Sequence, residues 1–336
     1  MTRVLCVRLS AMGDVVQSLG ALQAMHAMRP RFEFCFVTQR ENAPLLQGLA
    51  GLAHVIEHDR HGGLAAILHT RSRLRALRCD VALDFQGNLK SALCAWLSGA
   101  RERIGAAGSA RREPWSRALL TKTVAIAGPF HPAFVASCVA RALVPDAPFL
   151  PGRLCATDDE VQAAADFVRA AGINPSAAFT VLLLGRPEDP RSLQHAAIRA
   201  ELERDRPVLL LAGPSEHDVL APEGVPMWRQ TRGQLRVLVG LGALLARVGG
   251  FLVGADQGPA HVLAAAGAPT SILFGPQDPT LTAPPTAQVL QHPTPPSCMP
   301  CRERKCRHPN GPVCMAFTRA QGRPHAEPVW LRAAEP

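Results

Sequence analysis

Short apolar runs recur along the chain and alternate with stretches whose apolar residues repeat every three to four positions. In the first half, Val15, Leu19 and Leu22 fall at i, i+4 and i+7, which places them on one face of a helix. The apolar runs predict strands at residues 4–9, 32–38, 54–56 and 81–85. Further helices are expected at residues 89–97 and 133–143. Alternation of this kind predicts parallel strands with helices on both faces of the sheet.

A second alternating set follows a proline-rich segment. Residues 144–152 contain three prolines and no periodicity, so we place a linker there. Thr157, followed by acidic residues, marks the N-cap of a helix that opens the second half. Strands are then expected at residues 179–184, 208–212, 251–255 and 270–274, and helices at 192–202 and 234–246. We therefore predict two Rossmann-like domains, residues 1–150 and 151–336, with ligands at the carboxyl ends of their strands.

Composition narrows the classes of partner. The 336 residues suffice for two domains, and 47% of them are hydrophobic. The formal net charge of +9 favours anionic partners, although a solvated arginine-rich surface explains it equally well. Aromatic residues make up 5% and tyrosine is absent, which argues against nucleic-acid binding by base stacking. No secretory signal or membrane span is expected, so the ten cysteines should be reduced thiols or metal ligands.

Two turns in the first half carry candidate chemistry. Residues 10–15 place the carboxylate of Asp14 after the first strand, where it can accept a proton from a hydroxyl group. Asp14 can equally be an acid that stabilises the start of a helix. Residues 84–91 place Gln86, Asn88 and Lys90 after the fourth strand, as ligand contacts or as ordinary turn residues.

The segment 251–279 reads as strand, turn, helix and strand. Gly258 lets the backbone approach a ligand, and Pro259 suits the first turn of a helix. The free amides of such a helix start form an anion site, so the turn predicts a bound phosphate. Upstream, Glu216 follows the strand at 208–212, where an acid can bind ribose hydroxyls or cap a helix.

Four cysteines lie close together near the end of the second domain. Cys298, Cys301, Cys306 and Cys314 occur among basic residues, without the paired CxxC spacing of common zinc sites. They can be ligands of a structural Zn or Fe, or free or redox-active thiols. Both interpretations stay open on the sequence.

In this order, the motifs resemble glycosyltransferase family 9, the ADP-heptose:lipopolysaccharide heptosyltransferases. The matching segments are residues 10–15, 84–91, 256–265 and 275–279, and the resemblance spans about residues 3 to 315. It implies a GT-B fold, in which two Rossmann-like domains face each other across a cleft. The first domain would bind the acceptor and the second the nucleotide sugar. Transfer would invert the anomeric configuration and need no cofactor or catalytic metal.

The resemblance also assigns roles to individual residues. Asp14 would be the general base that deprotonates the acceptor hydroxyl. The residues expected to contact the acceptor are Ser10, Gly13, Gln86 and Lys90. Glu216 would hold the ribose of the donor. The residues expected around the donor's diphosphate are Asp256, Gln257, Gly258 and His261.

Three departures from the family pattern affect this picture. Residues 185–194 lack the family's lysine, which neutralises the leaving diphosphate, so Arg186 or Arg191 is expected to replace it. Gln257 stands where the family has threonine. The basic run that binds acidic sugars is reduced to His58, Arg60 and His61.

We therefore expect a cytoplasmic transferase, at most peripheral to the inner membrane. It would move heptose or a related sugar from an ADP-sugar to a lipopolysaccharide core or similar acidic glycolipid. The missing lysine motivates one alternative, a nucleotide-sugar-binding protein with impaired catalysis. The cysteines motivate another, transfer of heptose to a protein, because some protein-modifying relatives hold iron in a cysteine finger.

Overall fold

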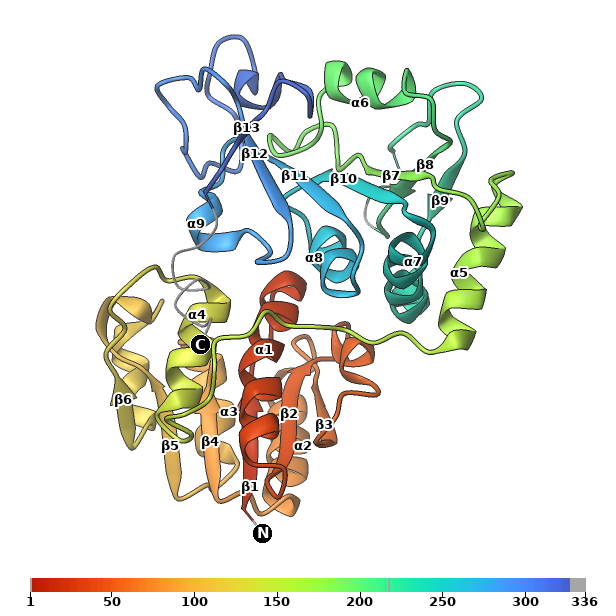
Figure 1. Cartoon of the computed structure of the whole chain (residues 1–336). Coiled ribbons are helices and arrows are strands. Elements are labelled where there is room, and N and C mark those ends of the chain that lie inside the picture. The colour runs from red at the N-terminus through yellow and green to blue at the C-terminus, as the bar shows by residue number, and fades with distance from the viewer. Residues whose placement is uncertain (1, 215, 217, 327–336) are drawn as a thin grey trace. The chain divides into compact units, whose positions relative to one another are not determined.

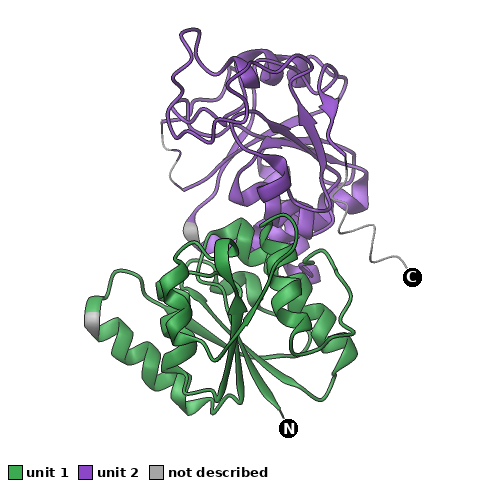
Figure 2. Ribbon diagram, turned by 90° about the vertical axis from the view of Figure 1, so that its left-hand side faces the viewer, with its two compact units in different colours: residues 1–153, 329–336 green, residues 154–328 purple. Residues whose placement is uncertain are grey.

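The computed structural model describes residues 2–214, 216 and 218–326, and these form two compact units. Unit 1 ends at Arg153 and unit 2 begins at Leu154 (Figure 2). Each unit is built around its own parallel sheet, as the alternating sequence pattern predicts. The proline-rich segment 144–152 belongs to unit 1.

Unit 1 contains a six-stranded sheet in the order β3-β2-β1-β4-β5-β6, with all strands parallel (Figure 1). Buried parallel strands are expected to be continuous apolar runs, and β1 and β2 are buried along almost their whole length. The strands are β1 (Arg3–Val7), β2 (Glu33–Gln39), β3 (Leu52–His58), β4 (Val81–Asp84), β5 (Glu102–Ala106) and β6 (Lys122–Val124). The helices are α1 (Met12–Met28), α2 (Gly63–Ala76), α3 (Leu89–Leu97) and α4 (Pro132–Arg141), with 3-10 turns at Ala43–Leu46, Gly108–Ala110 and Pro114–Leu119.

The helices of unit 1 cover both faces of its sheet. Helices α1 and α4 pack together on one face, and α2 and α3 pack together on the other (Figure 1). The core under α2 and α3 includes Leu5, Val37 and Ala82 from the sheet, with Leu74 and Cys94 from the helices. Burial of these apolar side chains is the main contribution to the stability of the unit.

Two glycines bring the proline-rich segment against α1. A Cβ on Gly20 would lie 1.9 Å from the carbonyl oxygen of Leu150, and one on Gly152 would lie 2.0 Å from the carbonyl oxygen of Val16. The side chain of Gln23 donates to the carbonyl of Arg153 (2.8 Å) and accepts from its amide (3.1 Å). The segment expected to be a linker is therefore fixed to the helix that carries Asp14.

Unit 2 contains a seven-stranded sheet in the order β13-β12-β11-β10-β7-β8-β9, in which only β13 is antiparallel. The strands are β7 (Thr180–Leu183), β8 (Val208–Ala212), β9 (Met227–Arg229), β10 (Phe251–Ala255), β11 (Thr270–Phe274), β12 (Gln288–Gln291) and β13 (Arg323–Pro324). The helices are α5 (Asp158–Ala170), α6 (His195–Leu202), α7 (Leu235–Val248), α8 (Gly258–Ala265) and α9 (Pro279–Thr282), with 3-10 turns at Arg232–Gln234 and Val313–Met315.

Helices α5 and α7 of unit 2 lie in close contact. A Cβ on Gly240 of α7 would lie 2.1 Å from the carbonyl oxygen of Glu160 on α5, so the glycine permits this approach. Beside it, the Arg236 guanidinium donates to both carboxylate oxygens of Glu160, each at 2.6 Å. Thr157 is the N-cap of α5, and its hydroxyl and Glu160 form the capping box. The N-cap expected from the sequence is thus confirmed.

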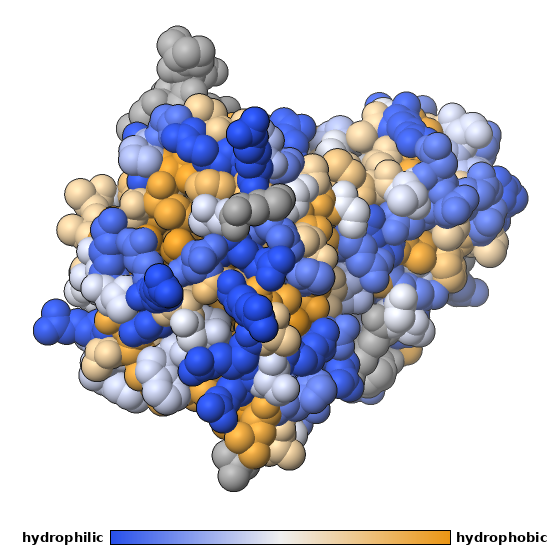
Figure 3. All heavy atoms as spheres, turned by 90° about the horizontal axis from the view of Figure 1, so that it is seen from below, coloured by the Kyte–Doolittle hydropathy of each residue, from blue (hydrophilic) through white to orange (hydrophobic). Residues whose placement is uncertain are grey.

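The surface shown in Figure 3 is mixed, with hydrophilic side chains spread between smaller hydrophobic patches. Such a mixture is normal for a surface that faces water. Among the described residues, no helix is both long and apolar enough to span a bilayer.

Candidate active site

Both sheets reverse their strand order at one point, and ligands of open α/β sheets bind beside that point at the carboxyl ends of the strands. In unit 1 the reversal lies between β1 and β4, and in unit 2 between β7 and β10. Figure 1 shows each pair of strands side by side. The loops after these four strands contain most of the residues that the sequence singled out.

In unit 1, Asp14 lies in the first turn of α1, directly after β1. Its Oδ2 accepts from the guanidinium of Arg8 and from the amide of Ala11 at 3.3 Å. Among the described residues, its Oδ1 has no hydrogen-bond partner, and the side chain is 31% exposed. The carboxylate is held through one oxygen and can accept a proton from a ligand through the other.

Arg8 is a residue that the sequence reasoning did not assign to the site. It is 7% exposed, and its Nη1 donates to the carbonyl of Phe85 at 2.7 Å while its Nη2 donates to Asp14. The guanidinium therefore ties the carboxylate to the loop after β4. The sequence held one signal for Arg8. It follows an apolar strand directly, and a charged side chain buried there needs a partner.

Gln86 connects the two loops of unit 1. Its Oε1 accepts from the amides of Leu9 (2.7 Å) and Ser10 (3.4 Å), which fixes the chain just before Asp14. The expected acceptor contact of Gln86 is therefore limited to its Nε2, since its oxygen is engaged. Ser10 is half-buried and Gly13 is buried in the first turn of α1, so both lie beside Asp14 in the chain.

A buried ion pair supports the loop after β4. Arg111 Nη2 donates to Asp84 Oδ2 at 2.9 Å, and both side chains are 0% exposed. The other oxygen of Asp84 accepts from the amides of Gln86 (3.1 Å) and Gly87 (3.0 Å), and Arg111 also donates to Ser116. Because each group is satisfied, the pair shapes the turn without leaving an unpaired charge. The pairing joins residues 27 positions apart, so the sequence pattern did not reveal it.

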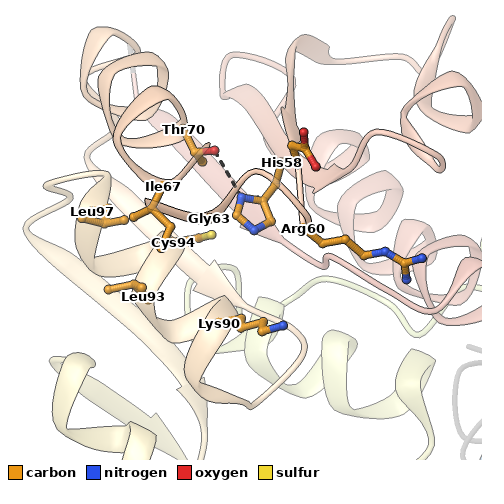
Figure 4. A pocket seen from close by; sticks show the side chains of 10 residues that line it. His58, Arg60, Gly63, Ile67, Thr70, Lys90, Leu93, Cys94 and Leu97 are labelled. Carbon is orange, nitrogen blue, oxygen red and sulfur yellow. Dashed lines mark hydrogen bonds between the residues drawn. The ribbon is translucent and has the colours of Figure 1, made fainter. Parts of the chain in front are cut away.

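Lys90 follows the loop after β4 directly, as the second residue of α3. It is exposed in the first turn of α3 and lines a pocket between α2 and α3, together with His58 and Arg60 (Figure 4). His61 is the neighbour of Arg60 and accepts from its Nε at 2.8 Å. The residues of the reduced basic run thus gather near Lys90.

In unit 2, Asp256 follows β10 and has both carboxylate oxygens engaged. Oδ1 lies 3.1 Å from Nε2 of His261, and Oδ2 accepts from the Thr282 hydroxyl at 3.0 Å. Burial alone raises the pKa of Asp256, but the hydrogen bond and charge of His261, with smaller contributions from Thr282 and Arg191, hold the pKa below its usual value. Asp256 and His261 therefore stabilise the turn that leads into α8.

That turn leads into the start of α8. Gln257 is the N-cap residue and Gly258 the first residue of α8, and Pro259 follows in the first turn. The first amides of a helix have no partner within it, and the helix dipole adds positive potential. The start of α8 therefore suits an anion, as the sequence predicts.

Of the two arginines expected to replace the family's lysine, Arg191 lies at this turn. Its Nη1 donates to the carbonyl of Asp256 at 3.3 Å, while Nε and Nη2 donate to the carboxylate of Asp189 at 3.0 and 2.6 Å. Arg186 is 53% exposed and lies 3.8 Å from Glu188. The geometry therefore favours Arg191, held in place by Asp189.

The loop after β7 lies directly against Gln257. Gly185 has φ +76°, and a Cβ there would lie 2.2 Å from Nε2 of Gln257 and 2.4 Å from the Ser192 hydroxyl. Only glycine fits both this conformation and this space. The side chain of Gln257 is accommodated by the missing side chain of Gly185.

Glu216 follows β8, and its carboxylate oxygen Oε2 accepts from the amide of Gly213 at 2.8 Å. One oxygen therefore closes the turn after the strand. The interpretation as a capping residue and the interpretation as a ribose contact are compatible, because a carboxylate can accept several hydrogen bonds.

The cysteine cluster does not form a metal-ligand group in this structure. Cys298, Cys301 and Cys306 are exposed and Cys314 is buried. Within the described part of the chain, no three His, Cys, Asp or Glu side chains lie where they could share a metal ion. The arrangement does not fit the structural Zn or Fe that the sequence left open.

Two of three comparisons with known proteins found a match. Residues 198–311 match the model of glycosyltransferase family 9 (heptosyltransferase), whereas a search of curated protein sequences gave no significant match. Among solved structures, the chain is similar to a family 9 glycosyl transferase of Veillonella parvula DSM 2008. The identity is 18%, the match covers 86% of this chain and 85% of that chain, and the TM-score is 0.72.

Two heptosyltransferases of E. coli are also similar. WaaC, solved with ADP, shares 22% identity with coverage of 86% of this chain and 92% of that chain, and a TM-score of 0.64. ADP-heptose lipopolysaccharide heptosyltransferase II shares 19% identity with coverage of 87% and 90%, and a TM-score of 0.67. These likenesses show that the two Rossmann-like units are those of a GT-B fold.

Proposed function

We propose that this chain is a family 9 glycosyltransferase, as the family match over residues 198–311 supports, and that it transfers heptose or a related sugar from an ADP-sugar to a lipopolysaccharide core or similar glycan, with inversion. Unit 1 would bind the acceptor and unit 2 the nucleotide sugar. The WaaC structure with ADP supports an adenine nucleotide as the leaving group. Under this proposal the enzyme acts in the cytoplasm, at most bound to the inner membrane surface, on an acidic glycolipid.

The observation that carries the proposal is the carboxylate of Asp14. It lies at the point of strand reversal in unit 1, is oriented by Arg8, and keeps Oδ1 without a partner among the described residues. A general base needs this combination of fixed orientation and one accessible oxygen.

Transfer then takes one displacement. Oδ1 of Asp14 accepts the proton of an acceptor hydroxyl as that oxygen bonds to the anomeric carbon of the donor. The bond from the anomeric carbon to the diphosphate breaks on the opposite side, and ADP leaves with the bonding electrons. Attack opposite to the leaving group inverts the configuration. The chemistry proposed here assigns no step to a metal.

The leaving diphosphate would be stabilised in unit 2. The amides at the start of α8 and the guanidinium of Arg191 provide positive potential beside the same turn. Glu216 would accept from the ribose hydroxyls with its carboxylate. Arginine can replace the family's lysine here because its fork of donors suits phosphate oxygens.

The test is the substitution Asp14→Asn, which keeps the shape of the side chain and removes the base. We expect kcat to fall by about 10²–10⁴-fold in a transfer assay. The affinity for ADP, measured by calorimetry, should be unchanged because Asp14 belongs to unit 1. Asp159→Asn is the matched control, since Asp159 is an exposed carboxylate in the first turn of α5. Transfer at the wild-type rate by the Asp14 variant would refute the assignment.

One observation favours a second candidate, a nucleotide-sugar-binding protein with impaired catalysis. Arg191, the residue proposed to replace the lysine, is paired with Asp189 and is not a free cation. ADP binding without turnover of any acceptor would support this candidate, and an inverted glycoside product would exclude it.

A further inference from the structure

The carboxylate of Asp256 is held by side chains from two different helices of unit 2. His261 of α8 lies 3.1 Å from its Oδ1, and the hydroxyl of Thr282, the last residue of α9, donates to its Oδ2 at 3.0 Å. The carbonyl of Asp278 lies 3.5 Å from the same hydroxyl, so the single proton of Thr282 belongs to the shorter bond. Because Asp256 is only 9% exposed, these partners replace water that burial removes.

The position of Thr282 depends on the cap of α9. This helix has only four residues, so its own hydrogen bonds contribute little and the cap decides where it lies. Asp278 is the N-cap, and its Oδ1 accepts from the amide (3.0 Å) and the hydroxyl (2.7 Å) of Thr280. Asp278 therefore fixes the turn from which Thr282 reaches Asp256.

The other oxygen of Asp278 binds the segment that contains the four clustered cysteines. We call residues 298–315 the cysteine loop. Nη2 of Arg302 in this loop donates to Oδ2 of Asp278 at 2.9 Å, and the amide of Arg302 donates to the carbonyl of Pro276 at 2.7 Å. The cysteine loop is therefore joined to the turn before α9 through a side chain and through the backbone.

The cysteine loop is itself attached to the core of unit 2. Met315, at its end, is 0% exposed and belongs to the cluster that includes Leu273 of β11. A Cβ on Gly275, directly after β11, would lie 2.7 Å from Sδ of Met315, so the loop packs closely on the backbone there. Arg302 therefore extends from an anchored loop, which lets it hold Asp278 in one position.

At Asp256 these contacts meet the turn proposed to bind the diphosphate. The carbonyl of Asp256 accepts from Nη1 of Arg191 at 3.3 Å, and Gln257 and Gly258 lead directly from Asp256 into α8. A displaced Asp256 would therefore move a cation and the first amides of α8 together. Donors stabilise an anion best when they are already aimed at its position, so a small displacement weakens binding.

We propose that Thr282 is a positioning residue of the diphosphate site, and that Arg302 of the cysteine loop supports it through Asp278. Thr282 acts through Asp256 and not by contact with the nucleotide. The inference rests on the proposed function, because it takes the start of α8 as the place where the diphosphate binds. It gives a basic residue of the cysteine loop a role in donor binding.

The hydroxyl of Thr282 is tested by calorimetry with ADP on the full chain. Thr282→Val removes the hydroxyl and should weaken ADP binding about tenfold, whereas Thr282→Ser keeps the hydroxyl and should bind like the wild type. Thr270→Val is the matched control. The Thr270 hydroxyl is buried and donates to Ala268 at 2.8 Å, beside the start of β10, whereas Asp256 follows the end of that strand. Wild-type affinity in Thr282→Val would overturn the proposal.

The support from the cysteine loop has its own pair of variants. Arg302→Ala should weaken ADP binding about threefold, as for the loss of a partly exposed ion pair, and Arg304→Ala should leave it unchanged. Both arginines are exposed in the same loop, so the two variants remove the same charge. Because the side chain of Arg302 is 55% exposed, this variant tests the same series of contacts even if Thr282→Val fails to fold. Equal ADP affinities of the two arginine variants would overturn the proposal.

Two further measurements separate positioning from a loss of stability and from the proposed function. In Thr282→Val the KM for the ADP-sugar should rise while the KM for the acceptor stays unchanged, whereas partial unfolding would lower only kcat. The imidazole NMR signals of His261, assigned with His261→Gln and recorded without ligand, should shift in Thr282→Val and not in Thr270→Val. Absence of that shift would overturn the proposal. A wild-type chain that binds no ADP would instead refute the proposed function, and the His261 signals would still decide whether Thr282 fixes Asp256.

Discussion

Arg191 is the residue proposed to act on the leaving diphosphate in place of a lysine. Its guanidinium is fixed between the carboxylate of Asp189 and the carbonyl of Asp256. The carboxylate of Asp189 orients the guanidinium and also neutralises part of its charge. Burial raises the pKa of Asp189, but the hydrogen bonds from Arg191 outweigh burial and hold this pKa below its usual value. The contribution of Arg191 to a bound diphosphate therefore depends on its position as much as on its charge.

If Arg191 stabilises the leaving diphosphate, Arg191→Ala should lower kcat by about 10²–10³-fold, as for the loss of one donor to a developing anion. Arg186→Ala is the matched control, because Arg186 is exposed and pairs only distantly with Glu188. Steady-state kinetics with an ADP-sugar measures both. Similar losses for the two variants would contradict the preference for Arg191.

At the residue scale, sequence reasoning located the turns better than the partners of their side chains. The positions of Asp14 and of the start of α8 in the fold could be predicted because both follow apolar strands. The contact of Arg8 with the carbonyl of Phe85 and the Asp84–Arg111 pair could not, because they join residues 77 and 27 positions apart. The oxygen of Gln86 looked available to a ligand, yet it binds backbone amides 76 and 77 residues away.

Among the elements, strands that are continuous apolar runs were predicted and short strands with charged residues were not. The expected strand at residues 251–255 coincides with β10, and that at 208–212 coincides with β8, because both are apolar runs. Strand β3 extends beyond the expected residues 54–56 at both ends, and at its C-terminal end Glu57 and His58 interrupt the apolar run. Strands β5, β6 and β9 were not predicted, because they are short and contain charged residues.

The contact between α5 and α7 gives a prediction about stability. Gly240→Ala would place a Cβ 2.1 Å from the carbonyl oxygen of Glu160, so the helices must separate. We expect the free energy of unfolding to fall by about 1–3 kcal/mol, as for other overpacked sites. Denaturant unfolding measures this.

Gly233→Ala is the matched control for this contact. A Cβ on Gly233, in the turn before α7, would meet nothing within 4 Å. That variant should be as stable as the wild type. An equally stable Gly240→Ala variant would show that the two helices are less closely packed than the structure indicates.

For the whole molecule, the reactivity of the cysteine thiols tests which of them are buried and whether any of them binds a metal. Cys155, Cys298, Cys301 and Cys306 are exposed, whereas burial raises the pKa of Cys94 to about 12 and that of Cys314 to about 11. The thiolate is the reactive form, so a raised pKa slows alkylation. The exposed thiols should therefore react with iodoacetamide in the native protein, and the buried thiols only after unfolding.

Mass spectrometry of the alkylated protein checks this prediction, alongside elemental analysis for Zn and Fe. Protection of Cys298, Cys301 and Cys306 together with one equivalent of metal would contradict the structure. It would also revive the metal interpretation that the cysteine spacing left open.

The close approach of residues 150–152 to α1 affects where the chain can be cut to express its two units separately. A proline-rich stretch between two domains is the usual place to cut a coding sequence into two separately expressed fragments. Here the backbone of that stretch rests on Gly20, and the amide of Leu154 already bonds to the carbonyl of Ala265 in unit 2. No spare chain therefore remains at the boundary. Fragments cut within 144–152 would deprive the helix that carries Asp14 of part of its own packing.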